Sequence, residues 1–317
     1  MDMMEDIQCI FCKKPSDVVA IEENGYTGKK CPICNLIYIS PRPRYVQTIE
    51  RYAKDASNTS AYSIISDDFP KRLNAKHTLS IIKQYANKGT ILEIGAGAGY
   101  FLDEARKNGF EVYGIEINRI QSEFINNVLK IPCENTKLSE SSFSNKRFDI
   151  IYHCNVLSHL SDPLEEFRII NQKLESGGMH VFETGNVGDV NRKYYRFLGT
   201  FDYPDHLFFF SVRSIERLLE EAKYNCLKIY KYSILPRLLV DKVLAGIRSN
   251  SRSQETIKAV KLDPTVNNSI SVRRNNKKQI LKYMRIYLSY ILTYKIGKIF
   301  PGKNIPQTLI IVARKQS

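Results

Sequence analysis

The chain has 317 residues, of which 43% are hydrophobic and 25% charged, so it is long enough to bury a substantial core and too apolar to stay disordered. No stretch of 18 residues is free of charge, and the opening residues MDMMEDIQCIF lack a basic segment followed by an apolar one. These features exclude a recognisable membrane span or secretion signal. We therefore expect a cytoplasmic protein.

The net charge of +14 is carried by one end of the chain. Residues 231–317 contain 18 Lys and Arg against three acids (Asp241, Glu255 and Asp263), a balance of +15, whereas the rest of the chain has 29 against 30, or −1. A basic region of this kind binds phosphates on nucleic acid, on a lipid surface or on a sugar nucleotide, or is a solvated helix face.

Four cysteines near the N-terminus have the spacing of a metal site. They form the pairs CIFC and CPIC, with 18 residues between them, and are Cys9, Cys12, Cys31 and Cys34. Four thiolates in two tight turns suit tetrahedral Zn(2+), and Asn35 suits the left-handed backbone that such a turn needs. Four protein ligands leave no position open for water, so we predict a structural zinc ribbon over residues 1–45. Two disulfides or free thiols are the alternatives.

Residues 90–118, TILEIGAGAGYFLDEARKNGFEVYGIEIN, have the pattern of a strand, a glycine-rich turn, a helix and a second strand. Glycines in the turn let the backbone approach a ligand, and Glu116 at the end of the second strand is placed to accept hydrogen bonds from ribose hydroxyls. Dinucleotide dehydrogenases use a similar turn. Here, however, Glu93 precedes the turn, and a carboxylate there repels a pyrophosphate and favours a cationic ligand.

The stretch LEIGAGAGYFL, together with Glu116, resembles the first two motifs of class I S-adenosylmethionine-dependent methyltransferases. The resemblance continues in chain order over residues 75–235 and 307–315. It implies an α/β fold with a doubly wound, seven-stranded, Rossmann-like sheet and S-adenosylmethionine as cofactor. The cofactor-binding residues that it implies are Glu93, Gly95, Ala96, Gly97, Gly99, Tyr100, Glu116, Ile117 and Asn155.

Three positions depart from the family pattern. Ser158 stands where many relatives carry the Glu that some of them use with a divalent metal, so those members are a poor guide. Lys223 stands where a Gly is common. The residue that contacts the adenine ring is one of Glu134, Asn135 and Thr136, and the sequence does not decide between them.

The segment GTFDYPDHLFFFS, residues 199–211, places two ionisable side chains among aromatic ones. Methyl transfer requires a positioned acceptor and, for a hydroxyl or carbon acid, removal of a proton, for which histidine is suited. A zinc ribbon followed by a methyltransferase domain with Tyr-x-acid-His resembles the sugar C-methyltransferases of deoxysugar pathways. The resemblance implies that Tyr203, Asp205 and His206 act on a sugar, nucleotide sugar or surface-glycan precursor. The alternative is that His206 is a satisfied interior histidine.

Residues 236–306 are a basic, largely helical insertion near the C-terminus. Residues 249–278 are polar, and we expect them to be partly mobile. Residues 277–300 have helical periodicity with a wide apolar face. This face is covered by the domain, by a second copy in a homodimer, or by the inner face of a membrane, where the protein would be peripheral. We expect the methyltransferase domain to comprise residues 46–235 and 307–317.

Two other functions compete with methylation of a glycan. An RNA base methyltransferase is less favoured, because the basic end lies far along the chain from the ribbon and no Asn-Pro-Pro-Tyr-like motif follows the fourth strand. A non-catalytic binding module with a cofactor fold is disfavoured by the intact glycine and acid positions.

Overall fold

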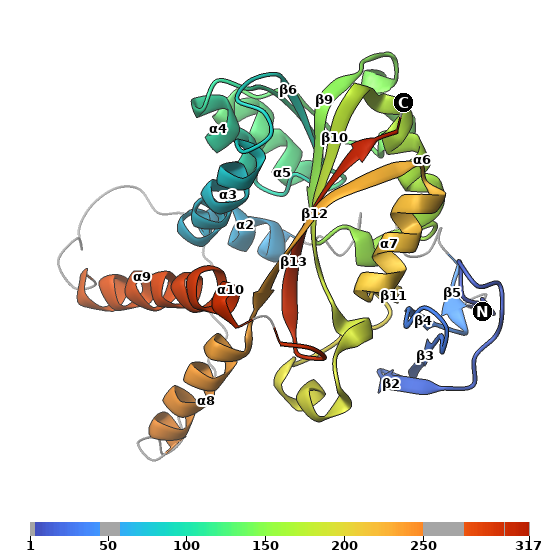
Figure 1. Cartoon of the computed structure of the whole chain (residues 1–317). Coiled ribbons are helices and arrows are strands. Elements are labelled where there is room, and N and C mark those ends of the chain that lie inside the picture. Colours follow the sequence, from blue (N-terminus) through green and yellow to red (C-terminus); the bar gives the residue numbers. More distant parts are fainter. Residues whose placement is uncertain (1–3, 45–57, 250–275, 301, 317) are drawn as a thin grey trace.

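The computed structural model describes residues 4–44, 58–249, 276–300 and 302–316. Figure 1 shows a central sheet with helices on both faces, a small N-terminal sheet beside it, and two helices that project from the opposite side. Of the segment 249–278, which we expected to be partly mobile, residues 250–275 lie outside the described residues, as does the predicted boundary at residue 45.

The central sheet has seven strands in the order β12-β13-β10-β9-β6-β7-β8. The strands β6 to β10 run parallel, and β13 lies antiparallel between β10 and β12. Their bounds are β6 (Thr90–Ile94), β7 (Glu111–Ile115), β8 (Cys133–Glu134), β9 (Phe148–Cys154), β10 (Leu174–Gly185), β12 (Tyr224–Ser233) and β13 (Gln307–Lys315). This sheet confirms the predicted doubly wound, Rossmann-like methyltransferase fold, and its order switches direction between β6 and β9, where such folds bind ligands.

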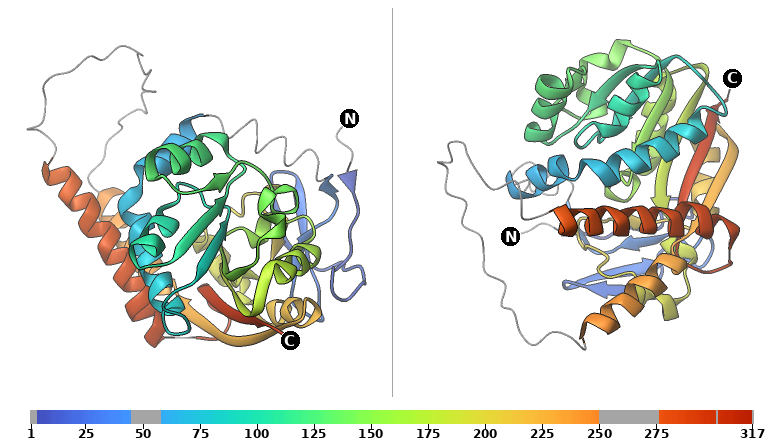
Figure 2. Two further views of the ribbon diagram at one scale, coloured as in Figure 1. Left: turned by 90° about the horizontal axis from the view of Figure 1, so that it is seen from above. Right: turned by 90° about the vertical axis from the view of Figure 1, so that its left-hand side faces the viewer.

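Helices cover both faces of the sheet, as the two further views show (Figure 2). Because both faces are covered, neighbouring residues of β6 are buried on opposite sides of the sheet. Ile91 packs into one core and Leu92 into the other, and both are fully buried. The first core contains α3 (Asp68–Ile82), α4 (Tyr100–Lys107) and the segment after α5 (Arg119–Phe124); the second contains α6 (Pro163–Lys173) and α7 (Val212–Glu221). The start of α7 is set by a capping box between Ser211 and Ser214.

The N-terminal sheet has four strands in the order β11-β4-β3-β2. Three come from the predicted ribbon: β2 (Val19–Glu23), β3 (Tyr26–Lys30) and β4 (Ile37–Ile39). The fourth, β11 (Phe208–Phe209), belongs to the predicted acceptor segment and pairs with β4. The ribbon and the acceptor segment therefore share one sheet, although about 170 residues separate them in the chain.

The C-terminal insertion forms α8 (Leu235–Ser249), α9 (Asn276–Tyr290), η7 (Ile291–Ile296) and α10 (Gly297–Ile299). One side of this helical region packs on the domain: the ring of Tyr294 lies 4.1 Å from that of His77 on α3. The other side is exposed, with Met284 62% and Leu281 59% accessible. Within the described ranges, no helix combines the length and apolarity that crossing a bilayer requires.

Candidate active site

The glycine-rich turn between β6 and α4 has a left-handed backbone that glycine adopts without strain. The φ angles of Gly95, Gly97 and Gly99 are +68°, +56° and +70°. A Cβ atom at Gly95 would lie 2.7 Å from the side chain of Val156, and one at Gly99 would lie 2.7 Å from that of Ile125, so packing closes both positions. A Cβ atom at Gly97 would meet nothing within 4 Å. Gly97 therefore faces open space beyond β6, where a ligand can approach the backbone.

Glu116, at the end of β7, is joined to this turn by hydrogen bonds. Its two carboxylate oxygens accept hydrogen bonds from the backbone N–H groups of Gly97 (2.7 Å) and Asn118 (2.8 Å). The Asn135 amide donates to the backbone carbonyls of Glu116 and Ile117, both at 2.8 Å. Ile117 itself is 42% exposed and offers an apolar surface beside the carboxylate. Asn135 therefore holds the chain at this point and has its amide already engaged.

Glu93, the last acid before the turn, is buried, and one of its carboxylate oxygens is not satisfied within the described residues. Only 5% of the residue is exposed. Burial, and then the neighbouring charge of Glu116, raise the pKa of Glu93 well above its ordinary value. Such a group is stabilised by a nearby cation. These residues therefore fit S-adenosylmethionine, which carries a sulfonium and an ammonium group.

Three other predicted cofactor residues are placed differently from one another. Tyr100 is buried and donates its hydroxyl hydrogen bond to the carbonyl of Ile65 in α2 (Asn58–Ser66), so it anchors a helix. Ala96 is 7% exposed inside the turn. Asn155 follows β9 with a φ of +55° and donates its backbone N–H to the carbonyl of Glu183 (3.0 Å). Asn155 is exposed and lines the pocket described below.

Two histidines meet where the acceptor segment crosses the loop after β9. The Nδ1 atom of His206 lies 2.8 Å from the carbonyl oxygen of Phe201, and that of His159 lies 2.9 Å from the carbonyl oxygen of Asp205. Because a carbonyl only accepts, each Nδ1 carries a hydrogen, and Nε2 of neutral His206 keeps its lone pair. The two ring centroids are 4.6 Å apart. Burial, and then the electrostatic interaction with the neighbouring His206 ring, lower the pKa of His159 to about 4.

Tyr203 contacts the ribbon. Its ring is 3% exposed, and its hydroxyl lies against Gly28 of β3, leaving no room there for a Cβ atom. The backbone N–H groups of Phe201 and Tyr203 donate to the Glu23 carboxylate at 2.9 and 3.0 Å, and the Asn24 amide donates to the Tyr203 carbonyl at 2.8 Å. The structure thus brings His206 and His159 together, whereas the Tyr203 side chain packs against Gly28 of the ribbon.

The four predicted metal ligands lie together at one end of the ribbon. All four sulfur atoms lie within 4.8 Å of one another, and those of Cys9 and Cys34 are 3.5 Å apart. Tetrahedral zinc with Zn–S bonds of about 2.3 Å needs sulfur atoms about 3.8 Å apart, so the cluster fits this ion. The residues that follow each pair, Lys13 and Asn35, have φ angles of +51° and +60°. The donor set and both turns therefore suit a structural metal.

The cysteine cluster is joined directly to the main domain by hydrogen bonds. Arg217 of α7 donates a hydrogen bond to the Cys12 sulfur at 3.0 Å, and Ser211, which caps α7, donates to the Cys34 carbonyl at 2.7 Å. Together with the β4–β11 pairing, these bonds place the Cys cluster and the histidine loop in one continuous structure.

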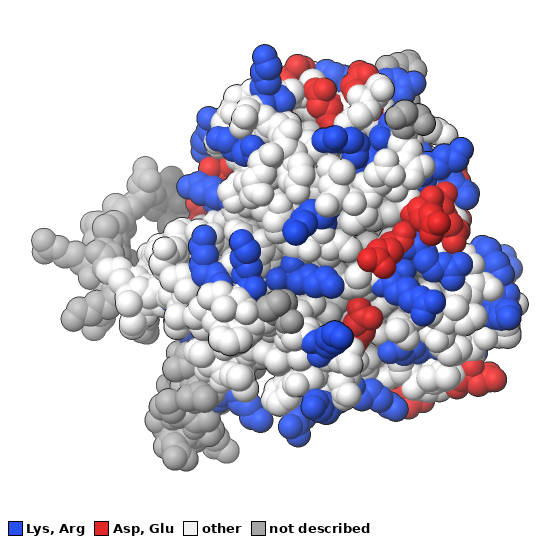
Figure 3. Space-filling view, in the orientation of Figure 1, with Lys and Arg blue, Asp and Glu red and all other residues white. Residues whose placement is uncertain are grey.

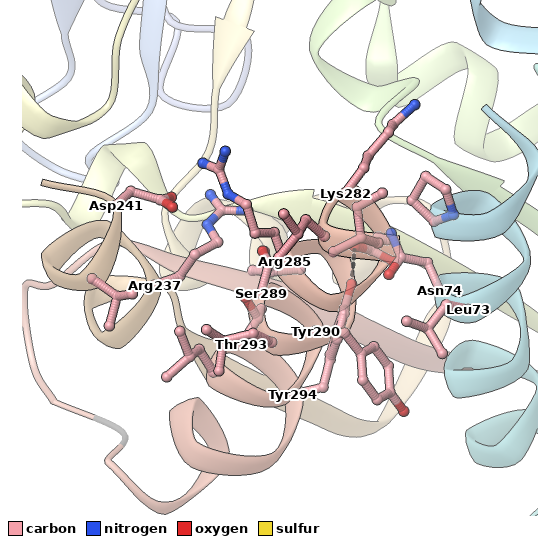
Figure 4. A pocket seen from close by; sticks show the side chains of 18 of the residues that line it. Leu73, Asn74, Arg237, Asp241, Lys282, Arg285, Ser289, Tyr290, Thr293 and Tyr294 are labelled. Carbon is pink, nitrogen blue, oxygen red and sulfur yellow. Dashed lines mark hydrogen bonds between the residues drawn. The ribbon is translucent and has the colours of Figure 1, made fainter. Parts of the chain in front are cut away.

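A pocket of about 730 Å³ opens between α3, α8 and α9 (Figure 4). Asn155, Glu183 and Thr308, at the ends of β9, β10 and β13, also line it. The Glu183 carboxylate is 7% exposed and accepts a hydrogen bond from the Tyr294 hydroxyl at 3.1 Å. Burial raises its pKa to about 7. Glu183 is missing from the residues predicted from sequence, although an acid at the end of a buried strand is a signal for it.

Comparison with known proteins agrees with this geometry. A family model described as a methyltransferase domain matches residues 67–229, more than half of the chain. The tRNA U34 carboxymethyltransferase of Helicobacter hepaticus is 30% identical over 107 residues, which are 30% of this chain and 34% of that protein. The ubiquinone biosynthesis O-methyltransferase of Ruegeria sp. is 29% identical over 103 residues, which are 30% of this chain and 41% of that protein. The chain thus spans between one third and about two fifths of these relatives.

Among solved structures, a putative sarcosine dimethylglycine methyltransferase from Galdieria sulphuraria is similar, with a TM-score of 0.47 and 18% identity, over 78% of this chain and 85% of that one. The family match itself covers β6 to β10, the glycine-rich turn and the histidine loop. The chain therefore belongs to the methyltransferase-domain family and contains a class I S-adenosylmethionine-dependent methyltransferase domain.

Proposed function

We propose that the protein transfers the methyl group of S-adenosylmethionine to a hydroxyl or carbon of a sugar, a nucleotide sugar or a surface-glycan precursor. The observation that supports the cofactor is the pair of buried acids, Glu93 and Glu116, at an open glycine turn. Glu93 lacks a hydrogen-bond partner for one oxygen among the described residues, so the site favours a cation. We further propose that the four-cysteine cluster holds a structural zinc ion.

The histidine loop supports a role in proton removal. When bound, S-adenosylmethionine supplies a methyl group that its sulfonium already activates. His206 is held by its Nδ1 hydrogen on the Phe201 carbonyl, so its Nε2 atom is free to accept a proton from the acceptor. His159 beside it stays neutral at pH 7, because its pKa is about 4, and adds no positive charge that would weaken this base.

A sugar acceptor is supported by the sequence context of this loop. The Tyr-x-acid-His segment resembles that of sugar methyltransferases, and its strand β11 continues the sheet of the cysteine ribbon. The ribbon therefore supports the histidine loop from one side. The insertion, with its pocket and exposed apolar face, lies on another side, and we propose that this region contacts the acceptor or the inner face of a membrane.

RNA is the second candidate acceptor, because the matching segment of one relative belongs to a tRNA U34 carboxymethyltransferase. Basic side chains form a band across one face of the molecule, with few acids among them (Figure 3). Lys295 and Lys298 of the insertion are exposed and add to the positive charge of the insertion. Binding to RNA would fall steeply with salt concentration.

Calorimetry with S-adenosylmethionine tests the donor site. The Glu93→Gln variant removes the charge that favours a cation, and we expect it to bind the cofactor about 10- to 100-fold more weakly than wild type. Thermal unfolding of the variant without cofactor separates weaker binding from a loss of folded protein. The control is Glu123→Gln, at a surface ion pair of α5. Unchanged affinity in Glu93→Gln would contradict the assignment.

A further inference from the structure

The pocket between α3, α8 and α9 connects the insertion with the carboxyl ends of the central strands. Its lining includes Asn155, which directly follows β9, and Glu183, which lies near the carboxyl end of β10. Its walls come from the two projecting helices and from α3 (Figure 4). The position of the pocket therefore suits an acceptor that reaches the cofactor from the side of the insertion.

Most of the wall is apolar. Leu73 of α3, Val240 of α8 and Leu281, Ile286 and Leu292 of the α9 region line the pocket. The apolar surface continues outside it along α9, where Met284 is 62% and Tyr287 51% exposed. A pocket with this lining and an apolar exit holds a chain of methylene or isoprenoid type more readily than a free sugar.

Cationic side chains lie at the same pocket. Arg237, Lys282 and Arg285 line it, against the two acids Asp241 and Glu183. Lys282 also makes an ion pair with Asp67 at 3.6 Å, whereas the described part of the chain shows no ion pair for Arg237 or Arg285. Figure 4 shows both guanidinium groups directed to the Asp241 side of the pocket, while Lys282 points away from them.

Among these cationic side chains, Arg237 has a buried N–H group that points to a ligand. Its Nε atom is buried and has no hydrogen-bond partner among the described residues. A buried guanidinium N–H without an acceptor is unfavourable, and the planar donor group of arginine matches the oxygens of a phosphate. An anion that enters with an apolar chain would satisfy this group and bury the surrounding surface.

We propose that this pocket binds the apolar, phosphate-bearing part of the methyl acceptor, as in an isoprenoid or acyl phosphate. The inference rests on the proposed function, since it assigns the substrate class of the same site. The phosphate contacts Arg237 and Arg285, the apolar chain lies along α9, and the group to be methylated points to the cofactor side at Asn155.

The test is equilibrium binding of dodecyl phosphate to the full chain by calorimetry, below the concentration at which the amphiphile forms micelles. We expect dodecyl phosphate to bind at least tenfold more tightly than dodecyl maltoside or inorganic phosphate. Arg237→Gln and Arg285→Gln should each weaken dodecyl phosphate binding about 10-fold or more. Lys228→Gln, at an exposed residue of β12, should leave it unchanged. Equal binding of the three probes, or wild-type affinity in both Arg variants, would overturn the proposal.

Two controls separate this inference from the proposed function. Each variant is first titrated with S-adenosylmethionine: retained cofactor affinity shows that the domain is folded, and a wild type that fails to bind the cofactor contradicts the proposed function instead. Sedimentation with and without dodecyl phosphate tests the alternative that a second copy covers the pocket. A dimer that persists and excludes the amphiphile would overturn the proposal.

Flotation with vesicles distinguishes the two sources of the ligand. Vesicles of phosphatidylcholine with phosphatidic acid present the phosphate in a bilayer, and vesicles of phosphatidylcholine alone lack it. Arg-dependent flotation with phosphatidic acid supports a membrane-borne acceptor, whereas binding to dodecyl phosphate without flotation supports a free one.

Discussion

The cofactor side and the proposed acceptor side of this protein are built in different ways. The cofactor side lies within residues 93–118, where a strand, a turn, a helix and a second strand follow one another, and Glu116 bonds to a backbone N–H only 19 residues away. The proposed acceptor side joins β4 to β11 and Tyr294 to Glu183, which are separated by more than 100 residues in the chain. The cofactor side should therefore tolerate damage to the ribbon or the insertion, while the proposed acceptor side should not.

The largest expected effect follows disruption of the proposed zinc site. Replacing Cys34 by Ser should open the cysteine cluster and lower the free energy of unfolding of the ribbon by several kcal/mol, because structural zinc contributes on the order of 10 kcal/mol to small zinc folds. Hydrogen exchange should then increase at β4 and at its partner β11, while cofactor affinity stays near wild type. The matched control is Cys226→Ser, an exposed cysteine outside the cluster. Unchanged exchange at β11 in Cys34→Ser would show that the two sides are not coupled through the ribbon.

Replacing the proposed base should give the next largest effect. In His206→Asn, the amide can still donate a hydrogen bond toward the Phe201 carbonyl. It has no basic nitrogen at the position of Nε2 to take a proton from the methyl acceptor. We expect turnover to fall about 10²- to 10⁴-fold while calorimetry shows the same cofactor affinity. Turnover within threefold of wild type would rule out His206 as the base and favour an interior structural histidine.

The pH dependence of stability should reveal Glu183. Its folded pKa of about 7 lies above its ordinary value of 4.5, so the folded state retains the proton after the unfolded chain has lost it. The stability associated with the neutral form is fully present below pH 4.5 and is lost as the pH rises to about 7, by up to about 3 kcal/mol. Glu183→Gln should remove this dependence in chemical unfolding measured from pH 4 to 8. If the free energy of unfolding changes with pH in the same way in the variant and in wild type, the raised pKa of Glu183 would be contradicted.

The smallest effect should distinguish backbone strain from ligand contact in the glycine turn. Gly97→Ala and Gly109→Ala should introduce the same backbone strain, because both glycines have positive φ angles. At both positions the added Cβ atom has open space around it. Each substitution should cost about 1 kcal/mol of stability. Only Gly97→Ala should also weaken cofactor binding, by about 10-fold, because only this residue lies in the turn beside Glu116. Equal cofactor affinity in both variants would mean that Gly97 does not face the ligand.

The parts that sequence could predict are those encoded locally. The apolar run of β6, the glycines after it and the acid after β7 have their roles within one strand–turn–helix–strand unit, so the pattern predicts both fold and cofactor. The departure at Lys223 also has a local meaning: its φ angle is +61°, the conformation for which a glycine is commonly used.

The parts that sequence could not predict depend on long-range packing. Nothing near Phe208 indicates that its strand completes the ribbon sheet, because strand pairing across such a distance leaves no local periodicity. The Tyr203 hydroxyl looks suited to an acceptor site in the sequence, yet it lies against Gly28. The acid near the end of β10 is visible in the sequence, but its contact with Tyr294 of the insertion, more than 100 residues away, is not.

The most direct test of the account is transfer of labelled methyl from S-adenosylmethionine into a lysate of the source organism, separated into RNA, lipid-extractable and water-soluble carbohydrate pools. The account predicts label in the lipid-extractable or carbohydrate pool, and its loss with His206→Asn. Label in RNA, or label that persists in the variant, would contradict it.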